Sequence, residues 1–118
     1  MNNSVKHDRL QSLITRDLIL IMQREIKNEI VNALTVHEVR LSGDNSIAKI
    51  YFSFLPTNGS NTLEVIKKEL EKCRKIIRAK LASKIQIRKC PDLVFKYDES
   101  FDAAKRIEDI LEKNKTEN

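Results

Sequence analysis

The chain is poor in the residues that build reactive sites. Its 118 residues include two cysteines, two histidines, two glycines, two prolines and no tryptophan. Cys73 and Cys90 have neither metal-type spacing nor a nearby histidine partner, so they do not form a disulfide framework or a zinc site. His7 and His37 are isolated, and the chain has no phosphate-binding loop or nucleophile elbow. We therefore expect no enzyme, no metal and no cofactor.

Long apolar runs are also missing. No stretch approaches the length of a membrane span, and the polar start, MNNSVKHDRL, is unlike a secretory signal. A length of 118 residues fits one domain. We expect a single domain over residues 1–118, with flexible ends at 1–6 and 113–118. Free thiols suit the reducing environment of the cytoplasm, where we expect the protein to act.

What the chain does have is concentrated positive charge. The whole chain has a net charge of +5, whereas residues 67–89 alone have a net charge of +8, from ten basic and two acidic residues. A concentrated positive field attracts phosphate backbones, although a solvated helix face is the simpler alternative. The residues expected to contact RNA are Arg74, Lys75, Arg78, Lys80, Lys84, Arg88 and Lys89.

Other basic and aromatic residues are weaker candidates. The scattered basic residues are Arg9, Arg16, Lys27, Arg40 and Lys49. Aromatic residues make up only 5% of the chain. Tyr51 could stack on a base, whereas the four phenylalanines (Phe52, Phe54, Phe95 and Phe101) fit a core. Contacts to the backbone of folded RNA are therefore expected to matter more than base stacking.

Apolar periodicity predicts the order helix, strand, strand, helix, strand, helix. A first helix capped by Asp8 follows a loose arm and ends near residues 28–32. Strands at 34–41 and 48–54 flank a turn at 42–45, and the alternation of the first slips between Val36 and Val39, which indicates a bulge or a twist. This order defines an α+β domain with a three-stranded sheet and helices on one face.

Apolar periodicity also predicts the elements in the second half of the chain. Thr62 caps a helix whose apolar stripe is Leu63, Ile66, Leu70, Cys73, Ile77 and Leu81. The third strand places Leu93, Phe95 and Tyr97 on one face and Val94 and Lys96 on the other. Asp98 or Ser100 caps a last helix, whose apolar side is Phe101, Ala104, Ile107 and Leu111.

The order of residues between 77 and 100 is the most distinctive feature. The run PDLVFKYDES, preceded by Ile77-Arg78, Leu81 and Arg88, resembles the C-terminal half of the ribosome-binding factor A family. AKIYFS at 48–53 resembles the second strand of that family, and further likenesses span nearly the whole chain. The resemblance implies a type II KH-like domain with a kinked central helix.

The resemblance also implies a function. Such a factor is a non-enzymatic monomer that assists maturation of the small (30S) ribosomal subunit by binding 16S rRNA. In the family a ribosome-assembly GTPase often promotes release, and neither a cofactor nor a membrane is involved. Two alternatives remain open. One is a generic KH-like RNA-binding protein or chaperone without ribosome specificity, and the other is a protein-interaction module whose basic helix meets an acidic partner.

The chain departs from the KH and family patterns in two ways. KH domains usually clamp RNA with a Gly-x-x-Gly loop, but Gly43 and Gly59 lie in other loops. The family has an Ala-x-Gly kink between its two central helices, and this position falls at Cys73-Arg74-Lys75 here. Lys75 resists backbone angles that glycine permits. Either packing preserves the kink or the two helices run as one, and we expect the kink to be retained.

Overall fold

The computed structural model describes residues 2–55 and 62–101. In these ranges the elements are α1 (Asn2–Leu20), the π-helical turn η1 (Ile21–Glu25), α2 (Glu29–Asn32), β1 (Thr35–Leu41), β2 (Ile47–Ser53), α3 (Leu63–Ile85), β3 (Asp92–Tyr97) and the 3-10 turn η2 (Glu99–Phe101). The predicted α+β architecture is confirmed.

The sheet contains three strands in the order β1-β2-β3. β1 and β2 are antiparallel, and Asn45 in the turn between them takes a left-handed φ of 62°, which asparagine tolerates. β3 pairs in parallel with the other edge of β2, because α3 carries the chain back between these strands. The predicted bulge is confirmed by a register shift between Val36 and Glu38.

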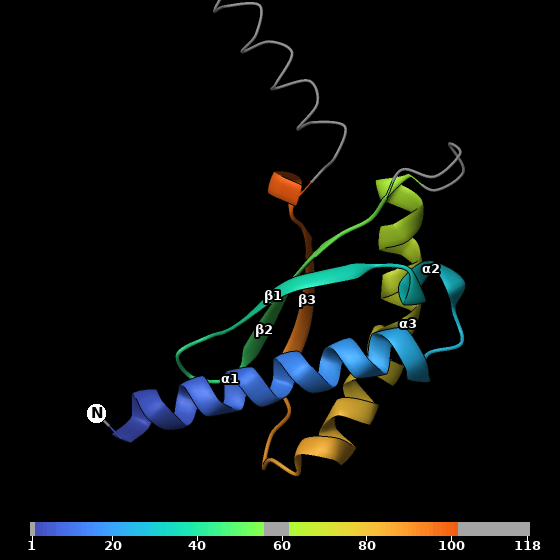
Figure 1. Ribbon diagram of the computed structural model, residues 1–118. Helices are drawn as coiled ribbons and strands as arrows, with labels where there is room; N and C mark the ends of the chain where they lie inside the picture. Colours follow the sequence, from blue (N-terminus) through green and yellow to red (C-terminus); the bar gives the residue numbers. More distant parts are fainter. Residues whose placement is uncertain (1, 56–61, 102–118) are drawn as a thin grey trace, which may run out of the picture.

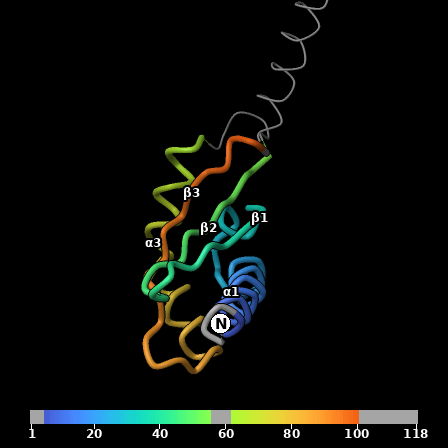
Figure 2. The backbone as a smooth tube through the Cα atoms, turned by 90° about the vertical axis from the view of Figure 1, so that its left-hand side faces the viewer, coloured from blue at the N-terminus to red at the C-terminus, as the bar shows by residue number. Residues whose placement is uncertain are grey.

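Side-chain alternation divides the sheet into a covered and an open face. On the covered face, Ala48, Ile50 and Phe52 of β2 are all 0% exposed, and Leu93 of β3 is also buried. These residues share one apolar core with α1 and α3. α1 contacts β1, α3 contacts β3, and the two helices contact each other (Figure 1). Figure 2 looks nearly along α1 and shows α3 beside β3. Helices on one face of the sheet are thus confirmed for the described residues.

The first helix begins earlier than predicted. α1 starts at Asn2, so the loose arm is wrong for residues 2–6, and the cap at Asp8 is wrong as well. No glycine or proline interrupts this stretch. His7 Nδ1 also lies 2.9 Å from Asn45 Oδ1 in the β1–β2 turn, which ties the first turns to the sheet. The apolar residues that this segment buries are Ile14, Leu18, Ile21, Met22 and Ile26.

The helix also ends earlier than predicted. Helical structure stops with η1, and Ile26 has an extended backbone (φ −102°, ψ 128°). The Asn32 side-chain amide donates to the carbonyls of Met22 and Ile26, at 2.7 and 2.9 Å. These bonds satisfy carbonyls that a helix leaves free at its C-terminal end. α2 is therefore a separate short helix, which the apolar pattern did not predict.

Asn28 caps α2 and links it to α3. Its Oδ1 accepts hydrogen bonds from the backbone N–H groups of Ile30 and Val31, at 3.0 and 3.2 Å. Its Nδ2 donates to Glu69 Oε2 at 2.8 Å. This bond, followed by that from Lys72, lowers the pKa of the Glu69 carboxyl group. One side chain thus positions the break after η1 and attaches it to the central helix.

Removal of the Asn28 side chain is expected to destabilise the protein. Asn28→Ala should lower the free energy of unfolding by about 1–2 kcal/mol, because two backbone donors lose their acceptor. Urea denaturation followed by circular dichroism measures the loss. Asn28→Ser keeps an acceptor for the cap and should retain most of the stability. An alanine variant as stable as the wild type would contradict the capping role.

α3 is one uninterrupted helix of 23 residues. Thr62 Oγ1 accepts from the N–H of Val65 at 3.3 Å, and the predicted stripe is buried from Ile66 to Leu81. The kink expected at Cys73-Arg74-Lys75 does not divide α3 into two helices, because helical structure continues through these residues. Lys75 favours a helical backbone at the position where the family has glycine. Figure 1 shows that the axis of α3 changes direction between its upper and its lower part.

The described chain ends at η2. The Asp98 carboxylate accepts from the N–H of Ser100 at 3.1 Å and from its hydroxyl, and the hydroxyl is the main cause of a lowered Asp98 pKa. Asp98 therefore caps η2, as predicted for the start of a last helix. The rest of that helix, including Ala104, Ile107 and Leu111, lies outside the described residues.

Candidate nucleic-acid interface

The basic segment turns sharply where α3 ends. Gln86 adopts the left-handed conformation (φ 53°, ψ 45°), and its N–H donates to the carbonyl of Ala82 at 3.2 Å. A left-handed residue at this position ends a helix and reverses the chain. Residues 86–91 then connect α3 with β3, and Arg88 and Lys89 are exposed in this connection.

Arg78 holds the connection against α3. Its guanidinium donates to the carbonyls of Cys90 and Pro91, at 2.7 and 3.1 Å, and lies 3.5 Å from Asp92 Oδ1. The Cys90 thiol donates back to the carbonyl of Arg78 at 3.8 Å. A planar guanidinium suits this task because its donors form a rigid fork. Arg78 thus has an internal role that the sequence did not reveal.

Three other predicted cations lie around this contact and on the connection. Lys75 lines a hollow of about 290 Å³ together with Arg78 and Cys90, and Arg88 and Lys89 directly precede Cys90 in the chain. Within residues 2–55 and 62–101, no acidic group pairs with these three cations. We refer to Lys75, Arg88 and Lys89 as the basic cluster.

The remaining predicted cations lie elsewhere. Arg74 pairs with Glu71 at 2.9 Å, and Lys84 pairs with Glu25 of η1 at 2.9 Å. Lys80 follows Lys75 by five residues, which places it roughly 140° further around the helix. The five predicted residues that lie in α3 are therefore spread over different sides of the helix. RNA would have to displace a carboxylate to reach Arg74 or Lys84.

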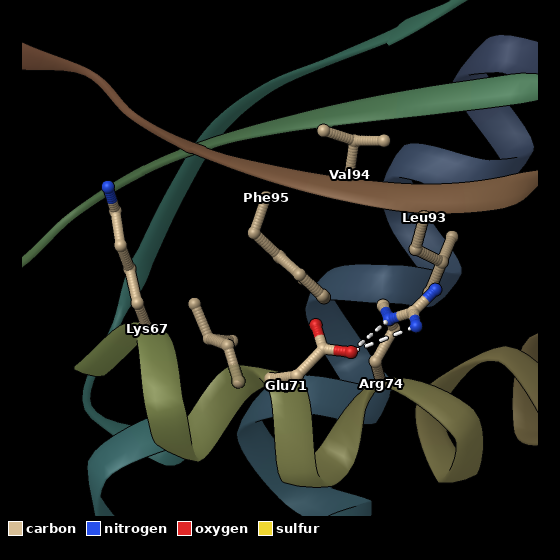
Figure 3. A pocket seen from close by; sticks show the side chains of 7 residues that line it. Lys67, Glu71, Arg74, Leu93, Val94 and Phe95 are labelled. Carbon is tan, nitrogen blue, oxygen red and sulfur yellow. Dashed lines mark hydrogen bonds and ion pairs between the residues drawn. The ribbon is translucent and has the colours of Figure 1, made fainter. Parts of the chain in front are cut away.

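A groove separates α3 from β3, and Figure 3 shows its lining. It has a volume of about 400 Å³, with Leu93 and Phe95 on the strand side and Lys67, Glu71 and Arg74 on the helix side. Arg74 donates twice to Glu71 Oε1, at 2.9 and 3.1 Å. Because Glu71 neutralises Arg74, the groove has less free positive charge than the basic cluster.

Sequence reasoning missed one cation-bearing surface, the open face of the sheet. Arg40, Lys49 and Lys96 come from three different strands, and all are exposed on this face. Arg40 and Lys49 were weaker candidates because they are scattered in the sequence, and Lys96 was not a candidate. Pairing between strands brings them together, and only the alternation within each strand indicates a shared face.

The two cysteines are free and buried. Cys73 lies in the core as predicted, and its sulfur accepts a hydrogen bond from Asn28 at 3.7 Å. Cys90 is only 9% accessible, and burial raises the pKa of its thiol. Over the described ranges, every helix is too short or too polar to cross a membrane.

The fold is therefore that of a KH-like α+β domain, and comparison with known proteins identifies its family. The family model described as Ribosome-binding factor A matches residues 6–111. The chain is 39% identical over 106 residues to Ribosome-binding factor A of Phytoplasma mali, covering 89% of this chain and 92% of that protein. The protein of that name in Brevibacillus brevis is 31% identical over 115 residues, covering 98% and 93%.

Solved structures lead to the same group. The crystal structure of ribosome-binding factor A from Thermus thermophilus is similar with a TM-score of 0.65 and 25% identity, over 77% of this chain and 94% of that one. A homology model of the same factor, fitted into a cryo-EM map of a 30S complex, has a TM-score of 0.62 and 26% identity, over 80% and 97%. The chain belongs to the ribosome-binding factor A family.

Proposed function

We propose that this protein is a non-enzymatic assembly factor of the small (30S) ribosomal subunit that binds 16S rRNA through the basic cluster. The observation that carries the RNA contact is the free positive charge of Lys75, Arg88 and Lys89 around the Arg78 contact. The preference for the small subunit is supported by the similar Thermus thermophilus factor, which was fitted into a 30S complex.

The proposed contact is electrostatic. Arg88 can bind a phosphate through two hydrogen bonds, whereas the ammonium groups of Lys75 and Lys89 are point charges on flexible side chains. All three side chains are exposed, so salt screens the attraction, and binding releases counterions from the RNA. Such contacts allow reversible binding, as a factor that acts transiently requires.

The proposed role follows from transient binding. The protein holds an immature conformation of the small subunit as a monomer in the cytoplasm, and it leaves when maturation is complete. A ribosome-assembly GTPase is the proposed trigger of release. The protein itself performs no chemistry in this proposal.

Co-sedimentation with purified small and large ribosomal subunits, over a series of salt concentrations, tests the proposal. We expect selective binding to small subunits that weakens as salt increases. Bulk transfer RNA is added throughout as a competitor for non-specific sites. Equal binding to both subunits would instead indicate a general RNA-binding protein. Binding that survives nuclease treatment and follows one protein would indicate a protein-interaction module.

A further inference from the structure

The open face of the sheet contains a hollow beside an aromatic ring. The hollow has a volume of about 280 Å³, and its lining includes Arg40, Ile47, Lys49 and Tyr51. Ile47 is 39% exposed, and Tyr51 is half-buried. β2 places Ile47, Lys49 and Tyr51 on the same face because they alternate with the buried residues of that strand. An apolar side chain and a ring thus flank a small cavity in the sheet surface.

Strand pairing places charged side chains of all three strands near this hollow. Lys49 lies between Arg40 of β1 and Val94 of β3, and Tyr51 lies between Glu38 of β1 and Lys96 of β3. Arg40 pairs with Glu38 at 2.8 Å, and its guanidinium lies 5.4 Å from the centre of the Tyr51 ring.

Lys49 and Lys96 differ from Arg40 because neither makes an ion pair with a described residue, although Glu38 of β1 lies on the same face. Within residues 2–55 and 62–101, no carboxylate pairs with either lysine. Lys49 precedes Tyr51 by two residues on β2, and Lys96 lies beside Tyr51 on β3. An anion that lies across β2 and β3 would meet both lysines.

From this arrangement we infer that the open face is a second RNA site, which takes one unpaired base against Tyr51 while Lys49 and Lys96 contact the adjacent phosphates. RNA fits better than an acidic protein because the site combines a stacking surface with separated cations. A single strand presents the same combination of flat bases and regularly spaced phosphates. The inference rests on the proposed function only in taking RNA as the ligand. It concerns a different surface from the basic cluster.

Binding of short RNA probes tests this inference. Tyr51→Ala should weaken binding of labelled oligoadenylate roughly tenfold, as expected for the loss of one stacked base. It should leave binding of an abasic oligomer of the same length unchanged. Tyr51→Phe keeps the ring and should bind like the wild type. Lys49→Gln/Lys96→Gln should weaken binding of both probes and lower the salt slope by roughly 0.7 for each charge.

Control measurements distinguish a specific RNA site from unfolding of a variant and from general attraction of polyanions. Circular dichroism checks that each variant is folded, and the lysine variants preserve the test if Tyr51→Ala is unstable. NMR amide shifts on addition of oligoadenylate should involve β2 and β3, and polyglutamate should not reproduce them. Equal weakening of both probes by Tyr51→Ala would overturn the inference, as would polyglutamate binding as tight as that of oligoadenylate.

The two proposals can fail separately. Selective binding to small subunits without any effect of Tyr51 on oligoadenylate would overturn this inference and leave the proposed function in place. Oligoadenylate binding that depends on Tyr51, together with equal binding to both subunits, would overturn the ribosomal assignment and support the site on the sheet.

Discussion

Replacing Lys75, Arg88 and Lys89 by glutamine is expected to weaken binding to small ribosomal subunits roughly 30-fold at low salt. The slope of log affinity against log salt concentration should decrease by two to three, because each lost phosphate contact removes roughly 0.9 from it. Glutamine is chosen because it removes the charge without adding repulsion. Co-sedimentation or fluorescence anisotropy over a salt series measures both quantities.

A matched variant controls for net charge. Lys67→Gln/Lys68→Gln/Lys72→Gln removes the same three charges from the first half of α3, so both variants have a net charge of about +2. Only the loss of long-range attraction should weaken this control. If both variants bind more weakly than the wild type and equally so, the basic cluster is not the contact and net charge alone explains the affinity. If both variants bind as tightly as the wild type, the protein binds RNA through another face.

Arg78 is expected to position the connection between α3 and β3, which carries Arg88 and Lys89. Arg78→Met should lower the free energy of unfolding by about 2 kcal/mol, because the carbonyls of Cys90 and Pro91 lose charge-assisted hydrogen bonds. Subunit binding should also weaken roughly tenfold. Without the contact, Arg88 and Lys89 have to be ordered when RNA binds, and ordering a backbone residue costs about 1–2 kcal/mol. Thermal unfolding and the binding assay measure the two effects.

Arg78→Lys distinguishes this role from a simple phosphate contact. Lysine keeps the positive charge but lacks the fork that reaches both carbonyls, so it should recover only part of the stability and affinity. Arg74→Lys is the control one turn earlier, where an exposed ion pair with Glu71 contributes little to stability. Full recovery of binding by Arg78→Lys would show that Arg78 acts on RNA as a charge and not through the connection.

Local patterns in the amino-acid sequence were sufficient to predict the strands of the sheet and α3. Alternation identified the buried residues Ala48, Ile50 and Phe52, and Thr62 was correctly predicted to cap α3. These features depend on residues that are close in the chain, where the period of apolar residues and the chemistry of caps have direct effects. The family resemblance could also be recognised from the sequence, because it depends on short motifs that follow one another in a fixed order.

Tertiary contacts decided where the first helix ends, whereas the continuity of α3 follows a local preference. The apolar stripe continues to Ile26, yet helical structure stops at Glu25 because Asn28 and Asn32 bind backbone groups that a longer helix would use itself. At Cys73-Arg74-Lys75, the expectation taken from the family conflicted with the helix propensity of Lys75. The continuous helix agrees with that propensity.

The sites depended most strongly on contacts between distant parts of the chain. Arg78 meets carbonyls 12 and 13 residues away, and Lys84 meets a carboxylate of η1, so identical charges in one basic run have different roles. Arg40, Lys49 and Lys96 share a face only because β1 and β3 both pair with β2. The sequence thus determined which segments are helical, extended or positively charged, because these are local properties. Tertiary structure decided which charges are neutralised and which remain free, because that depends on neighbours far away in the chain.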